Sequence, residues 1–183
     1  MALPRTFVGF SNTDIHAYRL LCVWKAHEHI DSDFIDCQLW DEILSEDEAY
    51  IKRKCRERIG MAGTYVMLIG QDTRYKYTYV RWEAEVALEK QCRIIGVNLD
   101  CWRYLNPATC PPVIVNVGAI FVPFSPRILA YALEHFQRKI HKDWIYDDEQ
   151  YRKLGYVLSG NTATMSPQSP PPFSFLQSFR EPF

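Results

Sequence analysis

The sequence predicts an α/β fold, flavodoxin-like, in which a five-stranded parallel sheet carries helices on both faces. Short apolar runs rich in β-branched residues alternate with segments of helical periodicity. The clearest unit spans residues 64–100, where apolar runs at 65–69 and 93–99 flank a helical segment at 79–90. Strand, helix and strand within so few residues predict a βαβ unit, whose two strands are parallel.

The elements before this unit follow from the same signals. Residues 6–10 form a short apolar run with few charges, which is typical of a central parallel strand. Helix N-cap residues at 11–14 follow, and they predict a helix over 14–27. A second strand is expected over 34–40. The helix expected over 46–59 has an acidic first turn and basic last turns, which match the helix dipole.

The elements after the unit are more irregular. Residues 101–112 contain Asn-Pro and Pro-Pro pairs, which break regular structure. Residues 113–117 are a candidate for an added edge of the sheet, and 119–123 form the expected fifth strand with its proline at the end. A Ser-Pro pair then predicts the start of a helix over 126–140, and a short helix is expected over 147–154.

Composition places the chain among soluble globular proteins. Of the 183 residues 48% are hydrophobic and the formal net charge is −1, so a nucleic-acid partner and a membrane span are not expected. We expect one domain over residues 1–155 and a Ser- and Pro-rich tail over 156–183. The six cysteines show no C-x-x-C pair or zinc spacing, and no signal peptide is visible, which indicates a reducing cytoplasm and no metal site.

Glu83 is out of place in the helix expected over 79–90. At about 100° per residue, it falls beside the apolar stripe, whereas Glu85 and Glu89 fall opposite. The stripe consists of Val80, Ala84, Ala87 and Leu88. Two interpretations stay open: Glu83 is a partly buried carboxylate satisfied by Arg81 or by first-turn amides, or it performs chemistry.

Other candidate residues follow the strands of the predicted sheet. In open α/β sheets ligands bind beyond the carboxyl ends of the strands. Phe10 and Ser11 follow the first strand, Asp36 and Trp40 end the second, and Glu83 stands beyond the third. The dinucleotide-binding, P-loop, zinc-protease and nucleophile-elbow motifs do not occur in the sequence.

Several sequence pieces resemble one family in order and spacing. They are Arg-Thr-Phe-Val-Gly-Phe-Ser at 5–11 with Asp14, Phe-Ile-Asp at 34–36 with Leu-Trp at 39–40, Leu-Ile-Gly at 68–70 with Thr73, Tyr-Val-Arg-Trp-Glu at 79–83, and Ile-Ile-Gly-Val at 94–97. These pieces resemble the TIR-like domains of bacterial antiphage systems, most closely the TIR-type sensor of Thoeris defence. The resemblance covers residue 5 to about residue 99 and fades after Cys101.

The resemblance implies an enzyme that cleaves the nicotinamide–ribose bond of NAD⁺, its substrate rather than a cofactor, and forms an ADP-ribose-type signal. Glu83 occupies the position of the catalytic glutamate. Phe10 and Trp40 are candidates for stacking on nicotinamide or adenine, Ser11 and Asp36 for hydrogen bonds to substrate, and Trp82 for substrate contact. Core packing is the alternative for Trp40 and Trp82, and capping of the next loop is the alternative for Asp36. The resemblance also implies a homo-oligomer, a phage-derived trigger, and a downstream effector reached through a diffusible nucleotide.

Two other classes remain open from the sequence. One is a non-catalytic TIR-like adaptor in which Glu83 is structural. The other is a receiver-like or nucleotide-binding domain of the flavodoxin type. Such a domain needs an acidic cluster after the first strand, and residues 11–14 supply only one carboxylate, Asp14.

Overall fold

The computed structural model describes residues 5–27, 34–35, 48–75, 78–138 and 143–158. The remainder of the predicted second strand and the predicted tail from residue 159 onward lie outside these residues.

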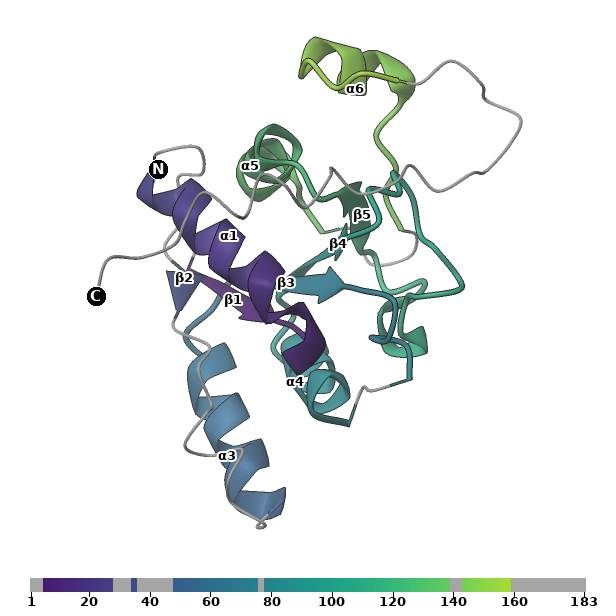
Figure 1. Ribbon diagram of the computed structural model, residues 1–183. Helices are drawn as coiled ribbons and strands as arrows, with labels where there is room; N and C mark the ends of the chain where they lie inside the picture. Colours follow the sequence, from purple (N-terminus) through teal and green to yellow (C-terminus); the bar gives the residue numbers. More distant parts are fainter. Residues whose placement is uncertain (1–4, 28–33, 36–47, 76–77, 139–142, 159–183) are drawn as a thin grey trace.

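A parallel sheet with strand order β2-β1-β3-β4-β5 forms the centre of the molecule (Figure 1). Its longest pairing joins β3 to β4 in a register from Thr64↔Arg93 to Ile69↔Asn98, whereas β2 adds two residues at the edge. This is the strand order of flavodoxin-like folds, and the predicted α/β fold with a parallel sheet is confirmed. The strands are β1 (Thr6–Gly9), β2 (Phe34–Ile35), β3 (Thr64–Ile69), β4 (Arg93–Asn98) and β5 (Ile120–Pro123).

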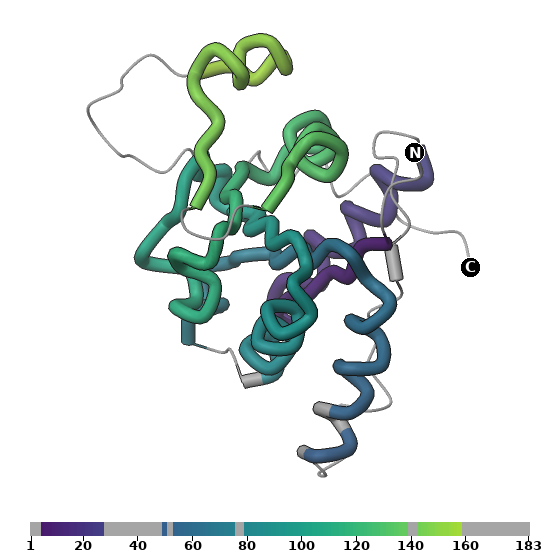
Figure 2. Tube along the Cα trace, turned by 180° about the vertical axis from the view of Figure 1, so that it is seen from behind, coloured from purple at the N-terminus to yellow at the C-terminus, as the bar shows by residue number. Residues whose placement is uncertain are grey.

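Helices cover both faces of the sheet. Figures 1 and 2 show α1 and α5 on one face and α3 and α4, side by side, on the other. α6 lies at the far end of the molecule, beyond α5. The helices are α1 (Ile15–Ala26), α3 (Glu48–Ile59), α4 (Thr78–Glu89), α5 (Pro126–His135) and α6 (Asp148–Lys153), with short 3₁₀ helices η1 (Asn12–Asp14) and η2 (Pro112–Ile114).

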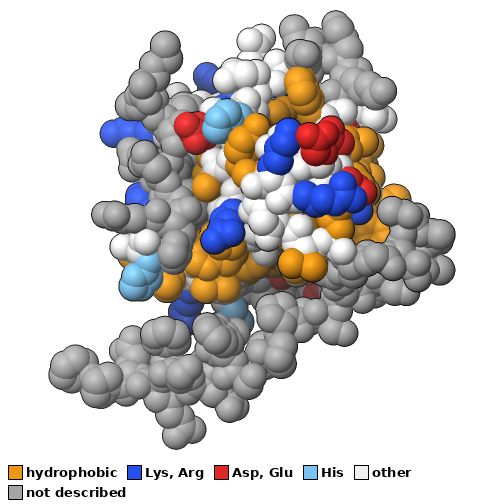
Figure 3. All heavy atoms as spheres, turned by 90° about the horizontal axis from the view of Figure 1, so that it is seen from above, with side chains coloured by type: hydrophobic (Ala, Val, Ile, Leu, Met, Phe, Trp, Pro, Cys, Tyr) orange, Lys and Arg blue, Asp and Glu red, His pale blue; other side chains and the backbone are white. Residues whose placement is uncertain are grey.

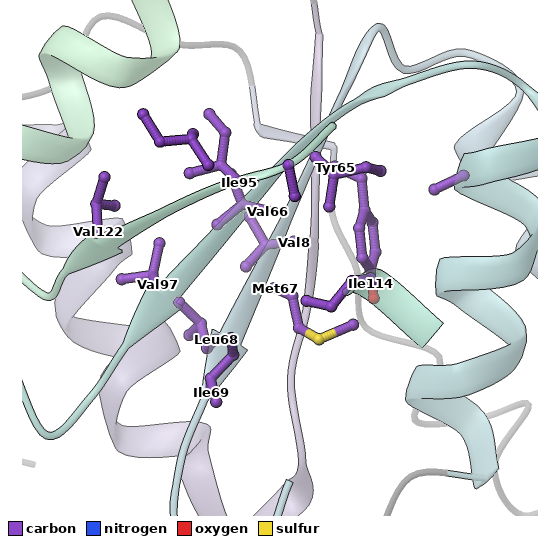
Figure 4. Packing of buried hydrophobic residues seen from close by; sticks show 14 of the residues in the cluster. Val8, Tyr65, Val66, Met67, Leu68, Ile69, Ile95, Val97, Ile114 and Val122 are labelled. Atoms are coloured by element: carbon purple, nitrogen blue, oxygen red, sulfur yellow. The ribbon is translucent and has the colours of Figure 1, made fainter. Parts of the chain in front are cut away.

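β3 is the most deeply buried strand, and all six of its residues are buried. Side chains alternate across the pleat, so Tyr65 and Met67 lie on the side of η2 and α4 while Val66 lies on the side of α1 and α5 (Figure 4). Burial on both faces explains why this strand is a continuous apolar run in the sequence.

Two expectations from the sequence are wrong. The stretch 113–117 adds no edge strand, because Pro112 begins η2 and Ile114 is buried within it. The helix expected to reach about residue 140 ends at His135. There the backbone of Phe136 turns to an extended conformation and its side chain enters the core, while its carbonyl accepts a hydrogen bond from Arg93 Nη1 at 2.8 Å.

One carboxylate fastens the segment that follows. The Asp143 carboxylate accepts hydrogen bonds from the backbone N–H groups of four successive residues, 116–119, at 2.7 to 3.1 Å. Asn116 and Gly118 have positive φ, at 58° and 78°, which turns these N–H groups toward one point. Trp144 then forms a parallel bridge to Ile120. Asp143 thereby holds the start of β5 against the chain that leads to α6.

The described surface carries mixed charge. The face seen in Figure 3 shows hydrophobic side chains interspersed with basic and acidic ones, in keeping with the net charge of −1. Among the helices of the described residues, none has the length and apolar character needed to span a membrane.

Candidate functional site

The helical phase of α4 places Glu83 on its buried side. Val80, Ala84 and Ala87 are at most 3% exposed, and Glu83 itself is 8% exposed. Glu85 points outward instead and pairs with Arg81 at 2.6 Å. The expected division between a buried Glu83 and a solvated Glu85 is confirmed.

Tyr65 and Gly9 hold the carboxylate of Glu83 from the sheet. Tyr65 lies beside Phe7 in the parallel register, with the two rings stacked at 6.0 Å. Its hydroxyl donates a long hydrogen bond, 3.5 Å, to Glu83 Oε2. A Cβ at Gly9 would lie 2.5 Å from the same oxygen and would also collide with the Tyr65 hydroxyl. Glycine at the end of β1 therefore makes the room that the carboxylate occupies.

The environment of Glu83 disfavours its charged form. Burial raises the pKa of Glu83 from 4.5 to about 8, and the hydrogen bond from Tyr65 opposes this rise. Desolvation outweighs the single hydrogen bond because one long contact replaces little of the lost hydration. At neutral pH the Glu83 carboxyl group of the protein without ligand is therefore mainly protonated.

A second polar cluster fixes the loop that leaves β3. Thr73 is fully buried, and its Oγ1 accepts a hydrogen bond from the Gly70 N–H at 2.8 Å and donates one to Asp14 Oδ2 at 3.3 Å. A Cβ at Gly70 would collide with the Asp14 carboxylate. The loop and η1 are thus joined at the carboxyl end of the sheet, the end at which Glu83 meets Gly9.

The same loop is anchored on its other side as well. The Arg74 guanidinium donates a hydrogen bond through Nη1 to the Pro107 carbonyl. The segment 101–112, expected to be irregular, contains no helix or strand before Pro112. It is ordered by polar contacts such as that between Asn106 Nδ2 and Asp100 Oδ2 at 2.8 Å. The loop before α4 is therefore held between η1 and this segment.

The structure places three further predicted residues near this end. Phe10 is half-buried and stacks on Tyr18 of α1 at 4.6 Å, so one ring face is already occupied. Ser11 is 6% exposed and accepts a hydrogen bond from the Thr13 hydroxyl at 3.0 Å. Trp82 is half-buried on α4, one residue before Glu83, and meets the Tyr79 ring edge-on at 5.4 Å. Asp36 and Trp40 lie outside the described residues.

Sequence reasoning missed Tyr65 as a partner of Glu83. Tyr65 stands in a continuous apolar run, where an aromatic residue predicts only core packing. The pairing of β1 with β3 would have indicated this contact, because it places Tyr65 beside Phe7. Phe7 lies two residues before Gly9 and therefore on the same face of the sheet.

Among the described residues, the site offers the buried carboxyl group of Glu83, with hydroxyls and aromatic rings near it. The described residues contain no group of three or more His, Cys, Asp or Glu side chains suited to holding a metal ion. A desolvated carboxylate beside a glycine, where no side chain fills the space, can stabilise positive charge on a bound molecule.

Comparison with known proteins identifies the family. A search of curated proteins finds no match. A profile described as "Thoeris protein ThsB, TIR-like domain" matches residues 7–103, which include Gly9, Tyr65 and Glu83. This match suggests a role in antiphage defence signalling. Because it covers more than half of the 183 residues, the chain belongs to the family of the TIR-like domain of the Thoeris protein ThsB.

Proposed function

We propose that this chain cleaves the nicotinamide–ribose bond of NAD⁺ and forms an ADP-ribose-type signal in antiphage defence. The observation that carries the proposal is Glu83, a buried carboxyl group held by Tyr65 and Gly9 at the carboxyl end of the sheet, in a chain of the ThsB family. In the proposed reaction the glycosidic bond breaks with its electron pair going to the nicotinamide nitrogen, whose positive charge is neutralised. No general acid is needed for this departure.

Glu83 acts on the other half of the reaction. As nicotinamide leaves, positive charge develops on the ribose, as in glycoside cleavage. An ionised Glu83 stabilises this charge, and the low-dielectric surroundings strengthen the effect. The pKa of about 8 falls when the cationic substrate binds nearby, because a neighbouring positive charge favours the carboxylate. Substrate binding therefore generates the active form of the residue.

The attacking group decides the product. If water adds to the ribose carbon and loses a proton, the product is ADP-ribose. If a hydroxyl or the adenine of the same molecule adds instead, the product is cyclic, and we propose that a cyclic product is the signal. Ser11, Phe10 and Trp82 are the proposed substrate contacts among the described residues, and Asp36 and Trp40 remain predictions. A diffusible product of this kind would reach a separate effector.

Assembly and control complete the proposal. We propose a cytoplasmic homo-oligomer, activated by a phage-derived trigger, that acts without nucleic acid or membrane. Activity per chain should then rise with protein concentration and level off once the oligomer has formed. Strict proportionality between rate and concentration over a hundredfold range would contradict the need for assembly.

The decisive test compares Glu83→Gln with Glu85→Gln, its matched control on the same helix. Glu83→Gln keeps the shape of the side chain and removes its charge, so nicotinamide release should fall by about a hundredfold or more, equivalent to about 3 kcal/mol. Glu85→Gln should retain the wild-type rate. The assay is run with purified protein and with extracts of phage-infected cells, because an enzyme that requires a trigger is silent without it.

One observation favours a second candidate, a non-catalytic signalling adaptor. Glu83 is 8% exposed and mainly neutral at pH 7, which also suits a structural carboxylic acid hydrogen-bonded to Tyr65. Cells that carry Glu83→Gln and resist phage as well as wild-type cells do would support the adaptor. Loss of resistance, with the variant protein folded and abundant, would support catalysis.

A further inference from the structure

A chain of hydrogen bonds joins the two loops that leave β1 and β3. Thr73, in the loop after β3, is fully buried. Its Oγ1 accepts a hydrogen bond from the Gly70 N–H at 2.8 Å and donates one to Oδ2 of Asp14, in η1, at 3.3 Å. One hydroxyl therefore closes the turn of its own loop and binds the neighbouring loop. We call this chain of Gly70, Thr73 and Asp14 the loop latch.

The Asp14 carboxylate is directed to the loop after β3 and away from its own helix. Asp14 is the N-cap residue of α1, yet its side chain makes no capping hydrogen bond there, although an aspartate at this position ordinarily caps the helix. A Cβ at Gly70 would collide with the carboxylate, so the carboxylate rests directly on the backbone of the other loop. The stability that a cap would supply to α1 is given up for this contact between loops.

The loop latch lies where the order of the strands reverses. In the order β2-β1-β3-β4-β5, the chain adds strands outward in both directions from the β1–β3 pair. In sheets of this order ligands bind beyond the carboxyl ends of these two strands. Gly9, which makes room for Glu83, ends β1, and Gly70 directly follows β3. The loop latch therefore joins the same two strands, at the same end of the sheet, as the candidate site.

The loop that the latch holds leads into the helix of Glu83. Only two residues separate Tyr75, in this loop, from Thr78, the first residue of α4. The other anchor of the loop, the bond from Arg74 to the Pro107 carbonyl, is exposed to solvent. The bond from Gly70 to Thr73 is buried, so water does not compete for it. A loop without this bond has more conformations open to it, and substrate binding must then order it at a cost in entropy.

We propose that Asp14 and Thr73 are positioning residues, which hold the loop after β3 in its substrate-binding conformation before the substrate arrives. This inference rests on the proposed cleavage of NAD⁺ and adds to it two residues that act through the loop. If the loop is in the competent conformation for only a fraction of the time, the apparent affinity falls by that fraction. Loss of the loop latch should therefore raise KM and leave kcat nearly unchanged, because the substrate-bound loop is ordered with or without the latch.

Substitution of Thr73 tests the proposal through the split between KM and kcat. Thr73→Val removes the hydroxyl with little change of shape, and Thr73→Ser restores it. Thr109→Val is the matched control, because Thr109 Oγ1 is buried and has no hydrogen-bond partner among the described residues. Nicotinamide release is measured over a range of NAD⁺ concentrations, with purified protein and with extracts of phage-infected cells. KM should rise about tenfold in Thr73→Val, with most of this rise absent in Thr73→Ser and all of it absent in Thr109→Val.

Two results would overturn the proposal. A hydroxyl with a purely structural role predicts a lower melting temperature for Thr73→Val with KM unchanged. The second result concerns Asp14→Asn, which keeps an oxygen that accepts from Thr73, and Asp14→Ala, which does not. The loop latch predicts a smaller rise of KM in Asp14→Asn than in Asp14→Ala. Equal rises would show that Asp14 acts through its charge and not through the loop.

Hydrogen exchange tests the loop latch independently of activity. Exchange of the Gly70 N–H, whose acceptor is Thr73 Oγ1, is followed without substrate in wild type, Thr73→Val and Thr109→Val. It should be about tenfold faster in Thr73→Val alone, and equal exchange in the three proteins would overturn the proposal. If wild type releases no nicotinamide in either preparation, the proposed function fails, and hydrogen exchange still decides whether the loop latch orders the loop.

Discussion

Replacement of Glu83 by Gln should change the pH dependence of folding in a defined way. The pKa of Glu83 in the folded chain is about 8, above the 4.5 of an unperturbed glutamate. The folded state therefore keeps a proton that the unfolded state releases. The contribution of this proton to stability is fully present below pH 4.5, falls as the pH rises toward 8, and is constant above it. Because the Gln side chain does not titrate, the stability of Glu83→Gln does not fall in this way as the pH rises.

The size of the effect follows from the pKa shift. One pKa unit corresponds to about 1.4 kcal/mol, so the shift to about 8 corresponds to about 4 to 5 kcal/mol. Because Glu83 is 8% exposed, solvent screening removes little of this. Relative to wild type, Glu83→Gln should be within about 1 kcal/mol at pH 5 and more stable by about 4 kcal/mol at pH 9.

Chemical denaturation at pH 5, 7 and 9 measures this difference. Glu85→Gln provides the control, since exposed Glu85 should give a curve parallel to that of wild type within about 0.5 kcal/mol. Parallel pH curves for wild type and Glu83→Gln would show that the Glu83 carboxyl group is solvated in solution. The reasoning that makes it a tuned catalytic group would then fail as well.

Three further predictions rest on individual contacts. Gly9→Ala should destabilise the fold by about 1 to 3 kcal/mol and reduce nicotinamide release, because the new Cβ would lie 2.5 Å from Glu83 Oε2. Denaturation and rate measurements that match wild type would refute this prediction. Tyr65→Phe removes the hydrogen bond that lowers the pKa of Glu83, so the pH–rate profile should move to higher pH, and an unmoved profile would count against this contact. Asp143→Ala leaves four backbone N–H groups without their acceptor and should lower the free energy of unfolding by about 3 kcal/mol. Asp147→Ala, at the N-cap of α6, should lower it by about 1 kcal/mol. Thermal unfolding of both variants measures the difference.

Local periodicity accounts for what the sequence predicted well. The position of Glu83 beside the apolar stripe depends only on residues of its own helix, so a helical wheel places it correctly. The order of strands and helices likewise follows from alternating short apolar runs and amphipathic segments. The βαβ unit around β3 and β4 was predictable because the central residues of both strands are buried on each face and are therefore apolar.

Contacts between distant residues account for what the sequence did not reveal. Asp143 and its four N–H donors are more than twenty residues apart in the sequence. A single aspartate in a sequence does not indicate which distant backbone N–H groups it binds. α5 ends at His135 because the Phe136 side chain finds a place in the core, although Gln137 and Arg138 are acceptable helix residues. Tertiary packing overrides local propensity at this point.

The anchoring of the loop before α4 has a consequence for how this family can diversify. On one side the loop depends on two specific side chains, Asp14 and Thr73. On the other side Arg74 reaches a backbone carbonyl, that of Pro107, and a carbonyl is present whatever residue stands there. Substitutions in the segment from 104 onward, beyond the family match, can therefore accumulate without detaching the loop. Changes of side chain in that segment therefore leave the anchor of the loop before α4 in place.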